Sequence, residues 1–144
     1  MIIIGLDNGF YVKSSRSFLT RDDLPNGIKF PFKQDYGGGI EIVYWRKNWG
    51  LRTEVISILV PEEVNYEADE IPYYYYAYKP SQVIEVIEVI ASFLDEDKWE
   101  EEGRSIWTYE EVRPHLVQDI INLALISVFM EENPDVYLEF YDSY

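Results

Sequence analysis

The stretch from Ile40 to Val60 constrains the fold more than any other part of the chain. Its first half alternates β-branched and aromatic residues, as strands do, and Asn48-Trp49-Gly50 then interrupts the run with residues typical of a turn. Apolar residues occupy both faces from Ile56 to Val60, which is typical of a strand covered on both sides. The pattern predicts two strands joined by a short turn, with helices as their cover.

A second hairpin is predicted over residues 2–15. Asn8-Gly9 is the most favourable pair for a two-residue type I′ turn, because both central residues of that turn need positive φ. The segment 21–39, rich in Gly and Pro, is predicted to be a long connection.

Helical spacing of apolar residues predicts two main helices in the C-terminal half. The first begins at Ser81 and stops at Gly103. Thr108-Tyr109-Glu110-Glu111 fits a capping box, and Pro114 is expected in the first turn of a main helix over residues 115–132, since Pro is excluded from helix interiors. Residues 136–141 alternate as a last strand does.

These elements predict a single α+β domain over residues 1–144. We expect a mostly antiparallel sheet built from residues 2–60, joined by strands at 72–78 and 136–141, with two main helices packed on one face. A chain of 144 residues, 47% of them hydrophobic, is long enough to bury one sizeable core.

The composition and the N-terminus indicate a cytoplasmic protein. The sequence contains no Cys, which excludes disulfides and thiolate metal sites. Met1 is followed by only three isoleucines before Gly5, an apolar run too short for a signal peptide or a membrane span. We therefore expect neither a membrane partner nor an oxidising compartment.

Charge is distributed unevenly along the chain, whose net charge is −15. Residues 1–60 hold eight basic and six acidic residues, a balance of +2, whereas residues 61–144 hold four basic and 21 acidic residues, a balance of −17. A field of that sign repels nucleic acid and anionic membranes and attracts basic proteins. A second interpretation, that the acids only keep a tyrosine-rich protein in solution, stays open.

Two segments of this acidic half are candidate partner-binding sites. An exposed tryptophan among carboxylates, where the first helix ends, would anchor a basic partner while the charges steer it. The alternative is that the tryptophan folds onto the core and the acids form a solvated cap. In the predicted strand at 72–78, four consecutive tyrosines place two on each face, and tyrosine brings a large contact area with a polar tip. The candidate residues are Asp95, Asp97, Trp99, Glu100, Glu101, Glu102, Tyr74 and Tyr76.

Residues 3–13, IIGLDNGFYVK, resemble the first phosphate hairpin of actin-like and Hsp70-like ATPases, a strand followed by Asp-x-Gly and a second strand. The resemblance implies that Asp7 would help to hold the metal-water shell and that the backbone at Gly9 would approach the phosphates. The second hairpin and the glycine-rich adenosine motif of that family have no counterpart in the sequence.

Other catalytic and metal-binding patterns fail on spacing. His115 is the single histidine and no G-x-S-x-G motif accompanies it. An EF-hand loop beginning at Asp95 would have Glu100 where glycine is required. The triplet Gly37-Gly38-Gly39 precedes a predicted strand and not the helix that a phosphate site needs. We therefore predict no catalytic residue, cofactor or metal.

The function expected from the sequence is that of a non-enzymatic module binding a basic protein. In charge and size the chain is similar to immunity proteins that neutralise nuclease toxins and to inhibitors of nucleic-acid-binding proteins. Two other classes stay open: a structural or assembly subunit that forms homo-oligomers through its tyrosines, and an enzyme using carboxylates or the Asp7 hairpin.

Overall fold

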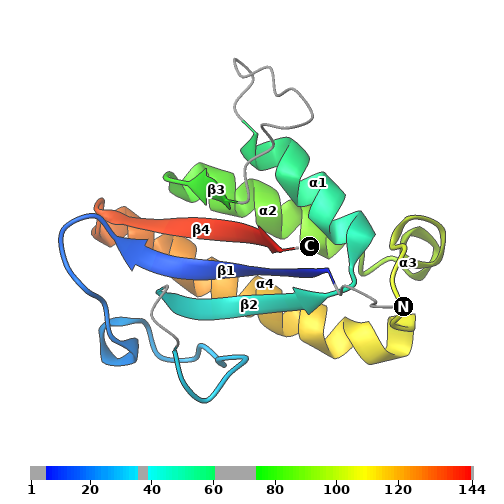
Figure 1. Ribbon diagram of the computed structural model, residues 1–144, viewed down its shortest axis with the longest axis horizontal. Coiled ribbons are helices and arrows are strands. Elements are labelled where there is room, and N and C mark those ends of the chain that lie inside the picture. The colour runs from blue at the N-terminus through cyan, green and yellow to red at the C-terminus, as the bar shows by residue number, and fades with distance from the viewer. Residues whose placement is uncertain (1–5, 36–38, 61–73, 144) are drawn as a thin grey trace.

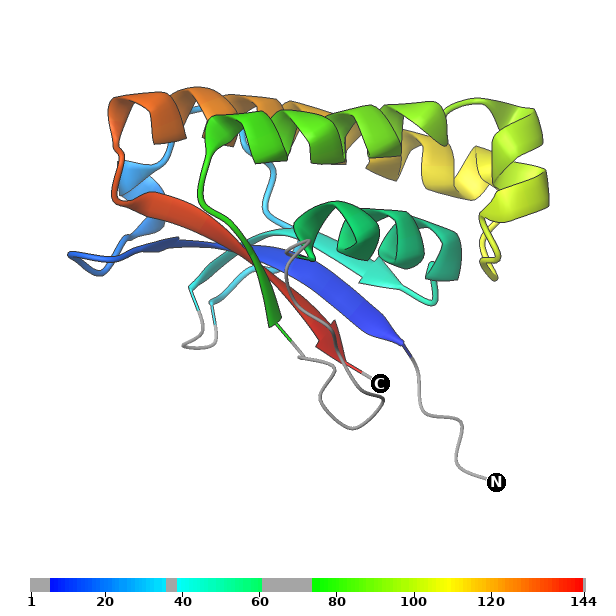
Figure 2. The same ribbon diagram turned by 90° about the horizontal axis from the view of Figure 1, so that it is seen from above.

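The computed structural model describes residues 6–35, 39–60 and 74–143. Its centre is a four-stranded antiparallel sheet in the order β2-β1-β4-β3 (Figure 1). Helices lie on one side of this sheet (Figure 2), so the predicted α+β class with helices on one face is confirmed. The strands are β1 (Asp7–Ser14), β2 (Ile40–Arg46), β3 (Tyr74–Ala77) and β4 (Val136–Ser143), and the helices are α1 (Trp49–Leu59), α2 (Pro80–Ser92), α3 (Glu96–Glu102) and α4 (Tyr109–Glu132).

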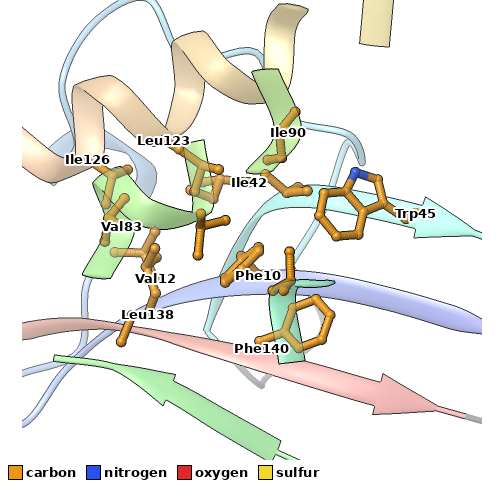
Figure 3. Packing of buried hydrophobic residues seen from close by; sticks show 14 of the residues in the cluster. Phe10, Val12, Ile42, Trp45, Val83, Ile90, Leu123, Ile126, Leu138 and Phe140 are labelled. Carbon is orange, nitrogen blue, oxygen red and sulfur yellow. The ribbon is translucent and has the colours of Figure 1, made fainter. Parts of the chain in front are cut away.

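The hydrophobic core fills the space between the sheet and the helices (Figure 3). On the sheet side, the Phe10 and Phe140 rings lie 4.8 Å apart, and Trp45 meets the Phe10 ring edge-on at 6.2 Å. From the helical layer, α4 contributes Leu123 and α2 contributes Ile90 to the core. Each such side chain contributes about 1.5–3 kcal/mol when fully buried, so this layer stabilises the sheet and fixes which of its faces is covered.

The prediction of a strand after Asn48 was wrong, because residues 49–59 form helix α1. Its buried side chains Leu51, Val55 and Leu59 recur every four residues, a helical period. The β-branched residues of α1 favour strands only weakly, and burial of the helix face that carries Leu51, Val55 and Leu59 outweighs that preference. The first half of the stretch does form the predicted strand, β2.

The prediction of a turn at Asn8-Gly9 was also wrong. Both residues lie inside β1, which pairs without interruption with β4 from Asp7 to Ser14. Asn8 points into the core side and donates from Nδ2 to Asp142 Oδ1 at 2.8 Å. Residues 2–5 of the predicted hairpin lie outside the described residues.

The predicted C-terminal elements are present with different boundaries. The first helix divides into α2 and α3, and Asp95 caps α3 by accepting from the Asp97 amide at 3.0 Å. Thr108 caps α4 as predicted, but α4 then runs without a break past Pro114, which lies inside the helix and not in its first turn. The residue is exposed, and because Pro has no backbone N–H, one hydrogen bond of the helix is missing there. The strands predicted at 72–78 and 136–141 are present as β3 and β4, with residues 72 and 73 outside the described part.

Within the ranges that the structure describes, no helix has both the length and the apolar composition needed to cross a bilayer.

Candidate functional site

The face of the sheet opposite the helices is lined by tyrosines. Cross-strand pairing places Gly9 between Tyr44 and Tyr141, with Tyr74 on the far side of Tyr141. Side chains alternate between the faces of a strand, so all four strands send a tyrosine to this side. We call this surface the tyrosine face; it consists of Tyr11, Tyr44, Tyr74, Tyr76, Tyr78, Tyr137 and Tyr141.

Five rings of the tyrosine face lie in contact with another tyrosine of that face, in two groups. Tyr11 and Tyr141 lie 5.1 Å apart between centroids. At the β3 edge, Tyr76 stacks on Tyr78 at 5.6 Å with an interplanar angle of 20°, and Tyr78 contacts Tyr137 at 5.4 Å. Such pairs add about 0.5–1.5 kcal/mol beyond their buried area, so these contacts order part of the tyrosine face.

Charged groups are interleaved with these rings. Tyr11 lies between Glu41 on β2 and Glu139 on β4 in the cross-strand ladder. Glu139 forms an ion pair with Lys13, and this partner raises the pKa of Lys13 although burial alone would lower it. At the other end of the face, the Tyr44 hydroxyl donates to Asp7 Oδ1 at 3.0 Å.

Glu41 reaches this face because β2 contains a bulge. Phe10 pairs with Val43 and Tyr11 pairs with Glu41, so Ile42 is an extra residue in β2. Residues 41 and 43 of a regular strand would share a face, which would place the Glu41 carboxylate in the core with Val43. The bulge keeps Ile42 and Val43 both buried in the core and turns Glu41 to the tyrosine face.

The carboxylate of Glu41 has an unusual environment. It is 8% exposed and accepts a hydrogen bond of 2.6 Å from the Tyr141 hydroxyl. Burial raises the pKa of Glu41 to about 7, the Tyr141 hydrogen bond opposes this, and the negative charges of Asp35 and Asp7 add to it. Near neutral pH this carboxyl group is therefore close to the midpoint of its titration.

The neighbouring phenols hold their protons more strongly than free tyrosine does. Burial and then the hydrogen bond to Asp7 raise the pKa of Tyr44 to about 12. Burial, followed by the hydrogen bond to Glu41, raises the pKa of Tyr141 well above its usual range. Both tyrosines therefore act as hydrogen-bond donors at any physiological pH, and neither is an anion that could serve as a nucleophile.

Gly9 provides the space in which this arrangement fits. A Cβ atom at this position would lie 2.2 Å from Glu41 Oε2 and 2.8 Å from Tyr141 Cε1. The Glu41 carboxylate and the Tyr141 ring therefore pack directly over the backbone of β1, in the gap that the missing side chain leaves.

The structure separates the two groups of candidate residues predicted from the sequence. Tyr74 and Tyr76 are exposed on the tyrosine face. The acids Asp95, Asp97, Glu100, Glu101 and Glu102 are exposed on or beside α3, which belongs to the helical layer on the other side of the sheet (Figures 1 and 2). One surface does not contain both groups.

Trp99 is not an exposed anchor. Its side chain is 4% exposed, meets Phe93 edge-on, and donates from Nε1 to the Trp107 carbonyl at 3.1 Å. Of the two interpretations of this tryptophan, packing onto the core is the one that the structure bears out. The exposed aromatic residue near α3 is Trp107, which is 38% exposed and donates from Nε1 to the Arg46 carbonyl at 2.8 Å.

Trp107 borders a cavity of about 320 Å³ between β2 and the start of α4. Trp45, Leu116 and Val112 give it apolar walls, and His115 lies at its edge as an exposed residue of α4. A volume of this size is at the lower end of the range for small-ligand pockets.

The site chemistry implied by the ATPase resemblance lacks its structural basis. That family needs a turn at Gly9, but Gly9 lies inside β1 and Asp7 accepts a hydrogen bond from Tyr44. In the parts of the chain that the structure describes, no group of three or more His, Asp or Glu side chains is arranged to hold a metal ion.

Several residues of the tyrosine face were not predicted from the sequence, although a signal for them exists. Tyr137, Glu139 and Tyr141 alternate along β4 just as Tyr74 and Tyr76 do along β3. That alternation identifies a shared face for each strand, but only the pairing of β4 with β1 and β3 brings the two sets together. The missed residues are Asp7 (in this role), Tyr11, Lys13, Glu41, Tyr44, Tyr78, Tyr137, Glu139 and Tyr141. Comparisons of the chain with protein-family models, with curated protein sequences and with solved structures found no match.

Proposed function

We propose that this protein is a small acidic binding module that engages a basic partner protein through the tyrosine face. The observation that carries the proposal is the composition of that face, where tyrosines from all four strands alternate with carboxylates and no described helix lies over them (Figure 2). Tyrosine is enriched at protein interfaces because its ring gives a large, rigid contact area and its hydroxyl a polar tip. Lysine and arginine suit such a surface, since they pair with carboxylates and also lie on aromatic rings.

The charge of the molecule favours a protein partner over nucleic acid. Aromatic sheet surfaces also bind single-stranded nucleic acids, but those surfaces combine their rings with positively charged grooves. Here the ammonium group of Lys13 lies in an ion pair with Glu139, and the molecule carries a net charge of −15. Phosphate backbones are repelled by that field, whereas basic proteins are attracted.

The acids of α3 have a separate role in this proposal. They lie in the helical layer and therefore contribute to the long-range field, not to the contact surface. Such charges speed association and are screened beyond about 8 Å at physiological salt. In this role the acids of α3 steer the partner while the tyrosine face binds it.

The class of partner follows from the same charges. We propose an immunity- or inhibitor-like role in the cytoplasm, in which the partner is a basic nuclease toxin or another nucleic-acid-binding protein. Such partners expose lysines and arginines that bind phosphate, and an acidic surface with tyrosines can cover them. The protein performs no catalysis in this role.

Affinity capture with matched variants tests the proposal. The immobilised protein is incubated with lysate of its source cell at low and high salt, and the recovered proteins are identified by mass spectrometry. We expect the wild type to recover basic proteins and the double variant Tyr74→Ser/Tyr76→Ser to lose them. The matched control is Ile84→Ser/Val128→Ser, which removes two exposed apolar side chains from α2 and α4 and should recover the same proteins as the wild type.

A third variant, Glu100→Gln/Glu101→Gln/Glu102→Gln, separates steering from contact. It should slow association at low salt and leave the dissociation rate unchanged, because it alters only charges distant from the bound surface. Recovery of the same basic proteins by the Tyr74/Tyr76 variant, or their loss in the helical control, would contradict the assignment of the tyrosine face. Homo-oligomers of the wild type that the tyrosine substitutions dissociate, seen by light scattering, would favour the assembly-subunit alternative.

A further inference from the structure

Two carboxylates occupy matching positions on the tyrosine face. Glu41 and Glu139 are the cross-strand neighbours of Tyr11 on either side, one on β2 and the other on β4. Both are more than nine-tenths buried, with exposed fractions of 8% and 6%. Burial of a carboxylate is costly unless a cation or several hydrogen bonds compensate it.

Only one of these two carboxylates has a cationic partner. Lys13 forms an ion pair with Glu139. Glu41 accepts one hydrogen bond, from Tyr141 to Oε2, and its other oxygen, Oε1, has no hydrogen-bond partner among the described residues. The described part of the chain contains no ion pair with Glu41, and the sequence outside it has no Lys, Arg or His.

The surroundings of Glu41 are suited to a cation. Its carboxylate lies over Gly9, the Tyr141 hydroxyl fixes one of its oxygens, and Tyr11 is its direct cross-strand neighbour. Negative charge from Asp7 and Asp35 acts on the same place. A carboxylate flanked by aromatic rings is the arrangement that binds ammonium and guanidinium groups, through an ion pair below and ring faces at the sides.

We propose that Glu41 is the receptor for a lysine or arginine side chain of the bound partner, which Tyr11, Tyr44 and Tyr141 surround. The inserted cation would do for Glu41 what Lys13 does for Glu139. This inference rests on the proposed function, because it assigns the chemistry by which the tyrosine face recognises a basic protein.

Proton linkage gives the site a specific signature. A bound cation stabilises the charged form of Glu41 and therefore lowers its pKa from about 7. Below that pH, binding releases a proton, and affinity rises as the pH rises through 7. The titratable and charged groups that face or act on this site are Asp7, Tyr11 and Lys13 on β1, Tyr44 and Arg46 on β2, Glu139 and Tyr141 on β4, and Asp35 in the loop before β2.

The test uses probes that carry a single cation, so that general attraction to an acidic protein contributes little. N-acetyl-arginine methylamide and N-acetyl-lysine methylamide are titrated into the full chain, and N-acetyl-citrulline methylamide, which is neutral and of nearly the same shape as the arginine probe, serves as the reference. NMR follows the Glu41 carboxyl carbon and the rings of Tyr11, Tyr44 and Tyr141. We expect the cationic probes to lower the pKa of Glu41 and shift these rings, and the citrulline probe to do neither.

Matched charge variants complete the test. Glu41→Gln retains an acceptor for the Tyr141 hydroxyl and removes a buried charge, so it should fold and should weaken binding of the cationic probes at least about tenfold. Glu88→Gln makes the same charge change on the exposed side of α2 and should change binding less than about twofold. Equal binding of arginine and citrulline probes, or equal binding by wild type and Glu41→Gln, would overturn the inference.

The lysate experiment distinguishes failure of this inference from failure of the proposed function. If Glu41→Gln recovers the same basic proteins as the wild type while Tyr74→Ser/Tyr76→Ser does not, the tyrosine face binds its partner without a cation at Glu41, and only this inference is wrong. If the cationic probes bind at Glu41 but the tyrosine variant still recovers every protein, the cation site stands and the proposed function is wrong.

Discussion

A missing side chain at Gly9 controls the geometry of the tyrosine face. The space above its Cα is occupied by Glu41 and Tyr141, and a Cβ there would also lie 2.5 Å from the Val43 carbonyl oxygen. Two of these neighbours are side chains that can move, but the carbonyl belongs to the backbone of β2. Any larger residue must therefore displace the β1–β2 ladder itself.

Gly9→Ala is expected to destabilise the fold by about 1–3 kcal/mol, the usual cost of overpacking. Urea denaturation followed by tryptophan fluorescence measures the change. The double variant Gly9→Ala/Glu41→Ala, compared with Glu41→Ala alone, should show a smaller loss, because the nearest clashing atom belongs to Glu41. A stable Gly9→Ala protein with an unchanged Tyr141 environment would show that the close approach does not exist.

Asp119 is a second residue whose environment sets a measurable property. It lies in the core between α4 and β2 and accepts a hydrogen bond of 2.8 Å from Trp45 Nε1. Burial raises the pKa of Asp119 from 3.8 to about 7, and the Trp45 hydrogen bond only partly opposes this. A group with a raised pKa in the folded state stabilises the protein below its unfolded pKa, and that contribution is lost as the pH rises through the folded pKa.

The wild type should therefore be less stable at about pH 8 than at about pH 5.5, and Asp119→Asn should reduce this difference by at least about 1 kcal/mol. The amide oxygen keeps an acceptor for Trp45 and cannot ionise. Denaturant midpoints at the two pH values measure the effect. Glu41 has a pKa raised in the same direction, so some pH dependence should remain in the variant. A difference as large in Asp119→Asn as in the wild type would show that this carboxyl group does not titrate in the folded state.

At Gly9 and Trp99 the sequence was informative about chemistry and misleading about position. Asn8-Gly9 has the composition of a hairpin turn, yet Gly9 is required for clearance within a strand and its φ is not positive. The close approach that requires it comes from β2 and β4, so no local pattern could have shown it. Trp99 likewise lies in an acidic stretch, and its burial depends on Phe93 and the Trp107 carbonyl.

Among the elements, those with a strong period and clear caps were predictable. The Thr108 capping box and the alternation in β4 depend on neighbours in the sequence, and both are present. Helix α1 was predicted as a strand because its β-branched composition was given more weight than the spacing of Leu51, Val55 and Leu59. The position of the tyrosine face was less accessible, since it depends on a bulge and on strand order.

Substitutions on two faces of helix α4 test which face packs against the core. Leu123 is fully buried, whereas Ile121 lies on the solvent side of the same helix. Leu123→Ala should cost about 2–5 kcal/mol, and Ile121→Ala should change stability by no more than about 0.5 kcal/mol. Thermal and urea unfolding of the two variants measures the difference, and similar losses at both positions would contradict the packing of α4 described here.

At the scale of the whole molecule, the sequence predicted an α+β fold with its helices on one face of the sheet. It did not predict which strands are neighbours. The two parts of the sequence that differ in charge, with a balance of +2 before residue 61 and −17 after it, contribute two strands each to the sheet. The order β2-β1-β4-β3 places β2 and β1, from the less acidic part of the sequence, beside β4 and β3, from the acidic part, so the two parts meet at the β1–β4 pair in the centre of the sheet. The tyrosine face consequently combines Lys13 and Glu41 from the first part with Glu139 from the second.

The pairing of β1 with β4 also determines when this protein can fold. β1 is a central strand, and its partner on one side, β4, lies more than 120 residues later, with Asp7 opposite Ser143. During synthesis on the ribosome, β1 and the residues up to α4 emerge before β4 exists, so one edge of the central strand has no partner to complete it. The chain must therefore remain incompletely folded until its last strand has left the exit tunnel, and its fold is acquired after translation of that strand and not progressively from the N-terminus.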